Sequence, residues 1–205
     1  MDKALELGVI VPSQASSWSQ VHLTKKPDDS WRFTLDFRGL NSVTQSMGWP
    51  IPNIPETLQR IGARRSKYFA IIDLTCGYNQ VPLAEESSDL TSFVCSEGLF
   101  KWKRLAMGLK GAGSHFQHHM SFTVLKGLVQ KICDVYFDDI IVDGKTAMEL
   151  INNLEKVFYR ARQFNIFFNP DKVKLCMTEV EYCGHLIDEH GLSFSIYERK
   201  KKSSS

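Results

Sequence analysis

A stretch of four residues in the second half of the chain has the residue types and spacing of a metal-binding turn. It is Tyr136-Phe137-Asp138-Asp139. Mostly apolar residues flank them at 131–135 and 140–142, which predicts a hairpin with both aspartates at its tip. Adjacent carboxylates repel one another, and partial burial penalises the ionised form of each. A divalent cation relieves both costs, because Mg²⁺ prefers oxygen ligands. The alternative is an ordinary polar turn, since aspartate is common in turns.

A third carboxylate ends a separate apolar segment. Residues 67–73 read as a strand that finishes on Asp73, and Gly77 shortly afterwards permits an unusual backbone or a close ligand. Asp73 and Asp138 are far apart in sequence, but each lies at the end of an apolar strand. The two strands could therefore be neighbours in one sheet, which would bring the carboxylates together.

The remaining segments predict the scaffold that positions these residues. Thr146 and Glu149 form a capping box that opens a helix, whose apolar stripe is assigned to the core. That stripe consists of Leu150, Ile151, Leu154, Val157, Phe158 and Ala161. Further helices are expected at 1–8, 56–61 and 114–126, and strands at 21–25, 32–37, 91–95, 99–105, 164–168 and 180–187. Strands alternating with two long helices predict an α+β fold, with a sheet and helices on one face.

Composition narrows the class of protein. A chain of 205 residues with 43% hydrophobic residues can bury a core, and its net charge of +2 does not by itself indicate a nucleic-acid partner. Lys25, Lys26, Arg32 and Arg38 nevertheless form a local basic hairpin, which is either a solvated face or a phosphate-binding one. Five cysteines without a C-x-x-C pair argue against a disulfide framework or a zinc site. No signal or transmembrane segment is found.

The order of the motifs resembles the reverse transcriptase domain, an RNA-directed DNA polymerase, of gypsy-type LTR retrotransposon polyproteins. The likeness runs from about Gly8 to Phe194. Each piece is short, but six pieces in the same order make the resemblance specific. They are residues 25–32, 35–41, 72–80, 108–117, 136–139 and 181–185.

The resemblance implies a right-hand polymerase fold of the α+β class. Fingers and palm are expected to interleave within residues 1–194, with the palm core at roughly 66–80 and 104–194, an antiparallel palm sheet and no thumb. Residues 195–205 are expected to be a disordered basic tail. The implied reaction adds deoxynucleotides to a primer 3′ end with two Mg²⁺ ions, or Mn²⁺. The implied partners are an RNA or DNA template with its primer and deoxynucleoside triphosphates, without a membrane. The implied location is a cytoplasmic retrotransposon particle, and RNase H and integrase segments are expected in the parent polyprotein.

The same resemblance implies the roles of individual residues. Asp73, Asp138 and Asp139 match the catalytic, metal-holding carboxylates, assisted by the backbone carbonyl of Leu74. The positions that match the nucleotide site are Lys25, Arg32, Cys76, Gly77, Tyr78 and Met107, and the aromatic at 78 would exclude a 2′-hydroxyl. The positions that match primer and template contacts are Gly113, Tyr136, Cys183 and Gly184. Lys172 matches a region that supplies a proton to the pyrophosphate, and Lys174 is an equal candidate.

The chain departs from this family in two places. Ala106-Met107 stands where many members have Pro-Phe, and Gly111-Ala112-Gly113 stands where they often have Asn-Ala-Pro. Loss of proline stiffness bears on the shape of the nucleotide pocket, not on the carboxylates. Two alternatives to an active reverse transcriptase stay open. One is an inactive relic or nucleic-acid-binding module that retains the fold, and the other is a DNA-templated repair polymerase with a similar palm.

Overall fold

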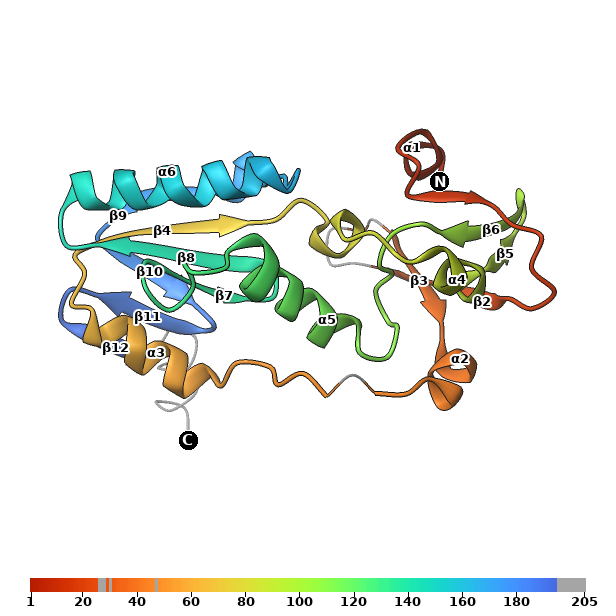
Figure 1. The fold of residues 1–205 in the computed structure, drawn as a ribbon, viewed down its shortest axis with the longest axis horizontal. Coiled ribbons are helices and arrows are strands. Elements are labelled where there is room, and N and C mark those ends of the chain that lie inside the picture. Colours follow the sequence, from red (N-terminus) through yellow and green to blue (C-terminus); the bar gives the residue numbers. More distant parts are fainter. Residues whose placement is uncertain (26–28, 30, 47, 195–205) are drawn as a thin grey trace. The chain divides into compact units, whose positions relative to one another are not determined.

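The computed structural model describes residues 1–25, 29, 31–46 and 48–194, without the side chains of Arg32, Ser193 and Phe194 (Figure 1). The expected tail at 195–205 therefore lies outside the described residues. The chain divides into two compact units. The first unit comprises Met1–Trp49 and Cys76–Phe116, and the second comprises Pro50–Thr75 and Gln117–Ser205. Residues 76–80 and 104–116, assigned above to the palm core, cluster with the first unit. Their assignment to the palm stays a prediction.

The first unit is built on a five-stranded sheet in the order β1-β6-β5-β2-β3. Its strands are β1 (Ile10–Pro12), β2 (Ser19–Lys25), β3 (Trp31–Asp36), β5 (Phe93–Cys95) and β6 (Gly98–Trp102). The β2–β3 hairpin and the β5–β6 pair confirm the strands expected there, although β5 and β6 are shorter than predicted. Buried Ile10, Phe93 and Phe100 form the core of this sheet. The short helices are α1 (Asp2–Glu6), α2 (Arg38–Val43) and α4 (Glu85–Ser88).

The second unit is built on a four-stranded antiparallel sheet in the order β7-β8-β4-β9. Its strands are β4 (Tyr68–Asp73), β7 (Cys133–Tyr136), β8 (Asp139–Gly144) and β9 (Lys174–Met177). The interior residues of β4 and β8 are buried on both faces, which explains why these segments are continuously apolar. Helix α6 (Ala147–Gln163) runs along one side of the sheet (Figure 1). Helix α3 (Ile54–Ala63) and the meander β10 (Glu179–Tyr182), β11 (His185–Asp188) and β12 (Gly191–Phe194) contribute to the core with Phe69 and Ile71.

The junction between β8 and α6 follows the expected capping chemistry. The Glu149 N–H donates to the Thr146 hydroxyl at 3.1 Å, and the Glu149 carboxylate accepts from the Lys145 N–H at 2.8 Å. Gly144 lies so close to the start of α6 that an added β-carbon would be 2.5 Å from the Leu150 nitrogen. The strand can therefore meet the helix only through a residue without a side chain.

The expected apolar stripe of α6 needs one correction. Leu150, Leu154, Val157 and Ala161 are buried as predicted, but Ile151 and Phe158 are exposed. Asn153 is buried in their place, and its amide donates to the Asp143 carbonyl at 2.9 Å. A prediction from hydrophobic periodicity considers only apolar residues. It therefore misses a buried polar side chain whose hydrogen bond is made to the backbone of a strand.

Three other segments differ from the expectation. The strand predicted at 180–187 is the antiparallel hairpin of β10 and β11, with Cys183 and Gly184 in its turn. The helix predicted at 114–126 is α5 (Ala112–His118) followed by a π-helical turn (His119–Val124). The strand predicted at 164–168 is wrong: the peptide groups of Phe164 and Ile166 close the C-terminus of α6, and only Phe168 forms an isolated bridge, with Leu74. In the described part of the chain, no helix is long and apolar enough to span a membrane.

Candidate active site

The three predicted catalytic carboxylates gather at one end of the β4–β8 pair in the second unit. Asp73 ends β4 and lies directly opposite Asp139, the first residue of β8. Asp138 occupies the two-residue turn between β7 and β8, which confirms the predicted hairpin; Asp139, also expected at the tip, pairs with Tyr136 instead. The Leu74 N–H donates to the Asp138 carbonyl at 3.2 Å and ties this turn to the end of β4. Phe137, the other turn residue, has φ +51°, a conformation that a bulky side chain rarely adopts.

The electrostatics of this end of the sheet disfavour ionised carboxylates. Burial raises the pKa of Asp138, and the neighbouring charges of Asp73 and Asp139 raise it further. Burial and the charge of Asp73 likewise raise the pKa of Asp139. The Oδ1 atom of Asp138 is buried, with no hydrogen-bond partner among the described residues. A cation at this position would supply the missing interaction.

Lys172 supplies one positive charge to the group. Its ammonium lies 3.2 Å from Oδ1 and 3.1 Å from Oδ2 of Asp73. Its charge partly offsets the rise that burial causes in the pKa values of Asp138 and Asp139. The Lys172 side chain is 62% exposed, so the contact can open without disturbing the core. Lys174, the other candidate, is exposed at the start of β9, opposite Ile71. The geometry therefore distinguishes the two lysines, and it brings Lys172 to the carboxylates.

The three carboxylates lie close together but do not form a complete metal-binding site. Among residues 1–194 as far as they are described, no three His, Cys, Asp or Glu side chains are arranged to hold a metal ion as they stand. Lys172 occupies both oxygens of Asp73, so a metal ion at Asp73 has to compete with this ammonium. The Leu74 carbonyl is not an acceptor in the bridge to Phe168, which uses the peptide groups of Asp73 and Thr75. The role of this carbonyl as an additional oxygen ligand, implied by the resemblance, stays a prediction.

Two of the residues predicted to hold the primer lie near these carboxylates. Tyr136 ends β7, and Cys183 begins the β10–β11 turn; both pack on the buried cluster that contains Ile141. Burial raises the pKa of the Cys183 thiol to about 11, with a further contribution from Asp139. Cys183 and Gly184 have φ +50° and +77°, as a tight two-residue hairpin turn requires. Their predicted role in holding the primer stays a prediction.

The residues predicted for the nucleotide site belong to the first unit. Tyr78 lies in a 3₁₀ turn (Gly77–Gln80) and stacks on Phe116 with ring centroids 4.8 Å apart. Cys76 is exposed with φ +48°, and Gly77 is buried. Met107 is exposed, and Lys25 ends β2 in an ion pair of 2.5 Å with Asp29. Gly113, predicted for the template side, lies in α5, and the Arg32 side chain falls outside the described residues.

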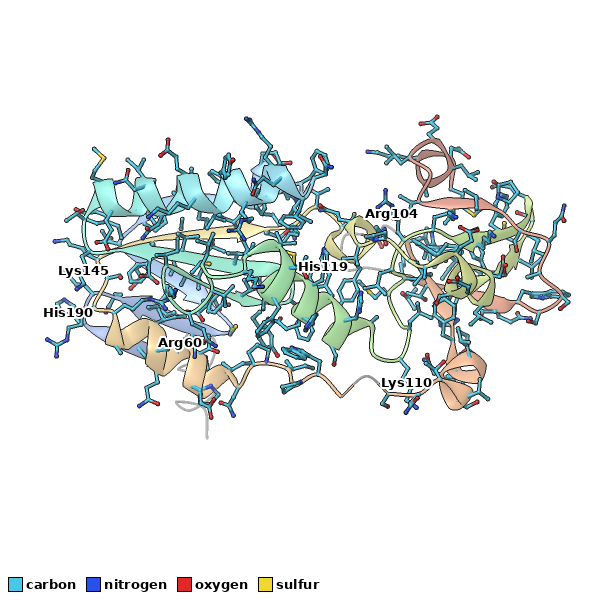
Figure 2. The ribbon with its side chains drawn as sticks, in the orientation of Figure 1. Arg60, Arg104, Lys110, His119, Lys145 and His190 are labelled. Carbon is cyan, nitrogen blue, oxygen red and sulfur yellow. The ribbon has the colours of Figure 1, made fainter. Side chains whose placement is uncertain are left out.

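A buried ionic network on α3, β7 and β8 was not anticipated from the sequence. Arg60, labelled in Figure 2, projects from α3 and donates to Oδ1 of Asp134 at 2.7 Å. Arg64 lies 2.8 Å from Asp134 Oδ2 as an ion pair without hydrogen-bond alignment, and its Nε donates to Asp143 at 2.8 Å. The Ser66 hydroxyl completes the set by donating to Asp143 at 2.6 Å. Two acidic residues within otherwise apolar strands were the signal that could have revealed it.

Gln117 is a second unanticipated feature, although it belongs to one of the motifs that carried the resemblance. Its side chain is buried, with 1% exposure, beside the outer edge of β7. The amide donates to the Val135 carbonyl at 3.0 Å and accepts from the Phe137 N–H at 2.8 Å. The sequence of α5, which also contains serine and two histidines, gives no signal that sets this glutamine apart.

The raised carboxyl pKa values lead to a prediction about metal binding and pH. Carboxylates bind metal only when deprotonated, and Asp138 and Asp139 take up protons at higher pH than ordinary aspartates do. We expect Mn²⁺ affinity to fall as pH falls, with a midpoint above the ordinary aspartate pKa of about 3.9. Titration of Mn²⁺ by electron paramagnetic resonance at a series of pH values measures this. Affinity that stays constant down to pH about 4 would contradict the assignment.

The sequence of the chain matches a known protein family. Residues 24–187 match the family described as reverse transcriptase (RNA-dependent DNA polymerase). The chain is 32% identical over 198 residues to a retrovirus-related Pol polyprotein from transposon 412 of Drosophila melanogaster, covering 94% of this chain and 16% of that polyprotein. The Pol polyprotein from transposon gypsy of the same organism is 32% identical over 91% of this chain and 18% of its own length. An enzymatic polyprotein of figwort mosaic virus is 33% identical over 90% of this chain and 28% of its own length.

Solved structures with a similar fold are also reverse transcriptases. The foamy viral protease-reverse transcriptase in complex with an RNA/DNA hybrid has a TM-score of 0.88 and 26% identity, over 98% of this chain and 27% of that one. Its counterpart in a complex with double-stranded DNA (the form named dRH) has a TM-score of 0.86 and 25% identity, over 100% of this chain and 35% of that one. The α+β fold with fingers and palm is thereby confirmed. The chain spans well under half the length of each of these relatives, and it belongs to the reverse transcriptase (RNA-dependent DNA polymerase) family.

Proposed function

We propose that this chain is an RNA-directed DNA polymerase domain that adds deoxynucleotides to the 3′ end of a primer. The observation that carries the proposal is the placement of Asp73, Asp138 and Asp139 at one end of the β4–β8 pair, half-buried and with raised pKa values at the last two. Clusters of carboxylates with shifted pKa values are typical of sites that bind charged substrates and metal ions. Membership of the reverse transcriptase family selects phosphoryl transfer among those chemistries.

The three carboxylates at this end of the sheet supply the oxygen donors that two Mg²⁺ or Mn²⁺ ions would take once Lys172 releases Asp73. Asp73 and Asp138 would hold both ions with the Leu74 carbonyl, and Asp139 would add negative charge. When bound, such ions lower the pKa of the primer hydroxyl and neutralise charge on the triphosphate and the leaving pyrophosphate. The unpartnered Oδ1 of Asp138 is the atom most in need of a cation.

Other residues of the chain would bind and orient the substrates. Lys25 and Arg32 are cations suited to a triphosphate. Lys172, whose ammonium lies 3.1 Å from Asp73 Oδ2, would deliver a proton to the pyrophosphate. Tyr136, Cys183 and Gly184 would hold the primer end. Gly113 would face the template, and Met107 would line the nucleotide pocket.

Primer extension by the purified chain tests the proposal. The expected result is template-directed incorporation on an RNA template that requires Mg²⁺ or Mn²⁺ and stops with a chelator. A well-folded chain that binds primer–template but incorporates nothing with either metal would support the alternative of a non-catalytic relic. Incorporation confined to DNA templates would instead support a repair polymerase.

Tyr78 gives a prediction about substrate choice. Its ring stacks on Phe116, which holds it as a rigid wall. We expect Tyr78→Ala to lower the preference for deoxynucleotides over ribonucleotides by about tenfold or more, a change of ~1.4 kcal/mol or more, because the wall is shortened. The measurement is the ratio of kcat/KM for the two nucleotides. Tyr78→Phe keeps the ring and should keep the ratio; an unchanged ratio in Tyr78→Ala would make Tyr78 a packing residue.

A further inference from the structure

The Gln117 side chain takes the place of a neighbouring strand along the outer edge of β7. In an antiparallel strand, alternate residues direct their peptide groups away from the partner. Val135 in β7 and Phe137, the turn residue that follows this strand, are such residues, since Tyr136 between them pairs with Asp139. The Gln117 amide donates to the Val135 carbonyl and accepts from the Phe137 N–H, as the backbone of another strand would.

This set of contacts suits a primary amide, which carries two donors and an acceptor. The Val135 carbonyl can only accept and the Phe137 N–H can only donate, which fixes the orientation of the amide. Its second N–H donates to the Ser121 hydroxyl at 3.0 Å, one turn along the same helix. Both amide hydrogens are therefore used. The side chain is buried, so loss of one partner would leave a polar group unsatisfied.

The contact bears on the residue that immediately precedes Asp138. Phe137 holds φ +51° although it has a bulky side chain, so its conformation needs support from the surroundings. Gln117 binds its N–H on one side of the turn, and the Leu74 N–H binds the Asp138 carbonyl on the other. Release of the first contact would let Phe137 relax and turn the peptide that carries Asp138.

We propose that Gln117 is a positioning residue that sets the direction of the Asp138 carboxylate through the backbone of Phe137. The inference rests on the proposed polymerase function and deepens it, because it concerns how one metal-holding carboxylate is aimed. Residues that orient metal ligands typically change metal affinity or activity by 10- to 100-fold when they are removed.

The chain offers a matched control for this role. Asn153 is also a buried amide, and it also donates to a carbonyl of the β7–β8 hairpin, at Asp143 near the far end of β8. Asn153→Leu and Gln117→Met each replace a buried amide by an apolar side chain of similar size. Both should lower the midpoint of thermal unfolding. Only the second should disturb Asp138.

The test combines Mn²⁺ binding with steady-state kinetics on the whole chain. For Gln117→Met we expect Mn²⁺ to bind about tenfold more weakly or worse, and kcat to fall about 10- to 100-fold with little change in KM for the nucleotide. Asn153→Leu should retain both values. Wild-type affinity and kcat in Gln117→Met would overturn the inference, as would equal losses in Asn153→Leu.

A measurement on the unaltered chain covers the case in which Gln117→Met does not fold. The Phe137 amide hydrogen should be protected from exchange with solvent as strongly as those paired within β7 and β8. Rapid exchange at Phe137 would overturn the inference. Wild-type protein that binds Mn²⁺ but extends no primer, with Mn²⁺ binding lost in Gln117→Met, supports the positioning role and rejects the polymerase. Wild-type protein that neither binds Mn²⁺ nor extends primer rejects both.

Discussion

We expect Asp138→Asn to abolish primer extension and to raise the midpoint of thermal unfolding of the metal-free chain. The first effect arises because asparagine is neutral and holds a divalent ion poorly. We expect a fall in kcat/KM of about three orders of magnitude or more, equivalent to ~4 kcal/mol of transition-state stabilisation. The second effect follows from the raised pKa of Asp138. A carboxyl whose pKa is raised by folding destabilises the native state when it is ionised, and this cost disappears as pH falls through its folded pKa.

Two measurements separate these effects. Extension assays on folded protein give the catalytic loss, and thermal unfolding at neutral pH in the presence of a chelator gives the change in stability. Asp2→Asn, at an exposed position in α1, removes the same charge and should alter neither value. Extension at the wild-type rate by folded Asp138→Asn would remove Asp138 from the catalytic site. A lower unfolding midpoint would show that its carboxylate stabilises the fold.

Arg64→Met is expected to have the largest effect on stability. Arg64 pairs with Asp134 and Asp143, whose side chains are only 1% and 3% exposed. Burial raises the pKa of Asp143, and Arg64 opposes that shift. Removal of the guanidinium leaves the buried carboxylates of Asp134 and Asp143 without this partner. Such changes typically lower the free energy of unfolding by about 3–5 kcal/mol. Denaturant-induced unfolding of the variant and the wild type measures the difference.

Two further variants test the cause of that loss. Arg38→Met removes an arginine whose ion pair with Asp36 is at the surface, and it should leave the unfolding free energy unchanged. Arg64→Met combined with Asp143→Asn should recover part of the loss, because the second change removes the unpaired charge. Equal destabilisation in the single and double variants would assign the effect to lost packing of the arginine stem.

The sequence was sufficient for the features that depend on local chemistry. The Tyr136–Asp139 hairpin, the strand that ends on Asp73 and the capping box at Thr146 each have short-range signals, and each lies where it was expected. The order of the motifs also identified the family. The pairing of Asp73 with Asp139 needed one further assumption, that the two strands are neighbours, and the register of β4 and β8 confirms it.

The features that escaped prediction depend on partners distant in sequence. Asp134 appears in the sequence as a polar break in an apolar strand, and only the approach of α3 shows that two arginines neutralise it. The strand predicted at 164–168 has the right composition, but its backbone groups are used to end α6. Gln117 is an ordinary helix residue until β7 lies beside it. Composition records what a side chain can do, whereas only the fold determines which partner is within reach.

The contact between Gly144 and the start of α6 determines which amino acids evolution can place at that position. Any β-carbon at position 144 would come within 2.5 Å of the Leu150 backbone nitrogen. The clash is with backbone atoms of α6, which cannot move aside as the end of a flexible side chain could. In a library that samples every amino acid at each position, selection for folded protein should therefore deplete even alanine at 144. Lys145, one residue later and exposed, should accept most substitutions. Sequencing of the selected library would reveal this as a sharp boundary between an invariant and a freely varying position.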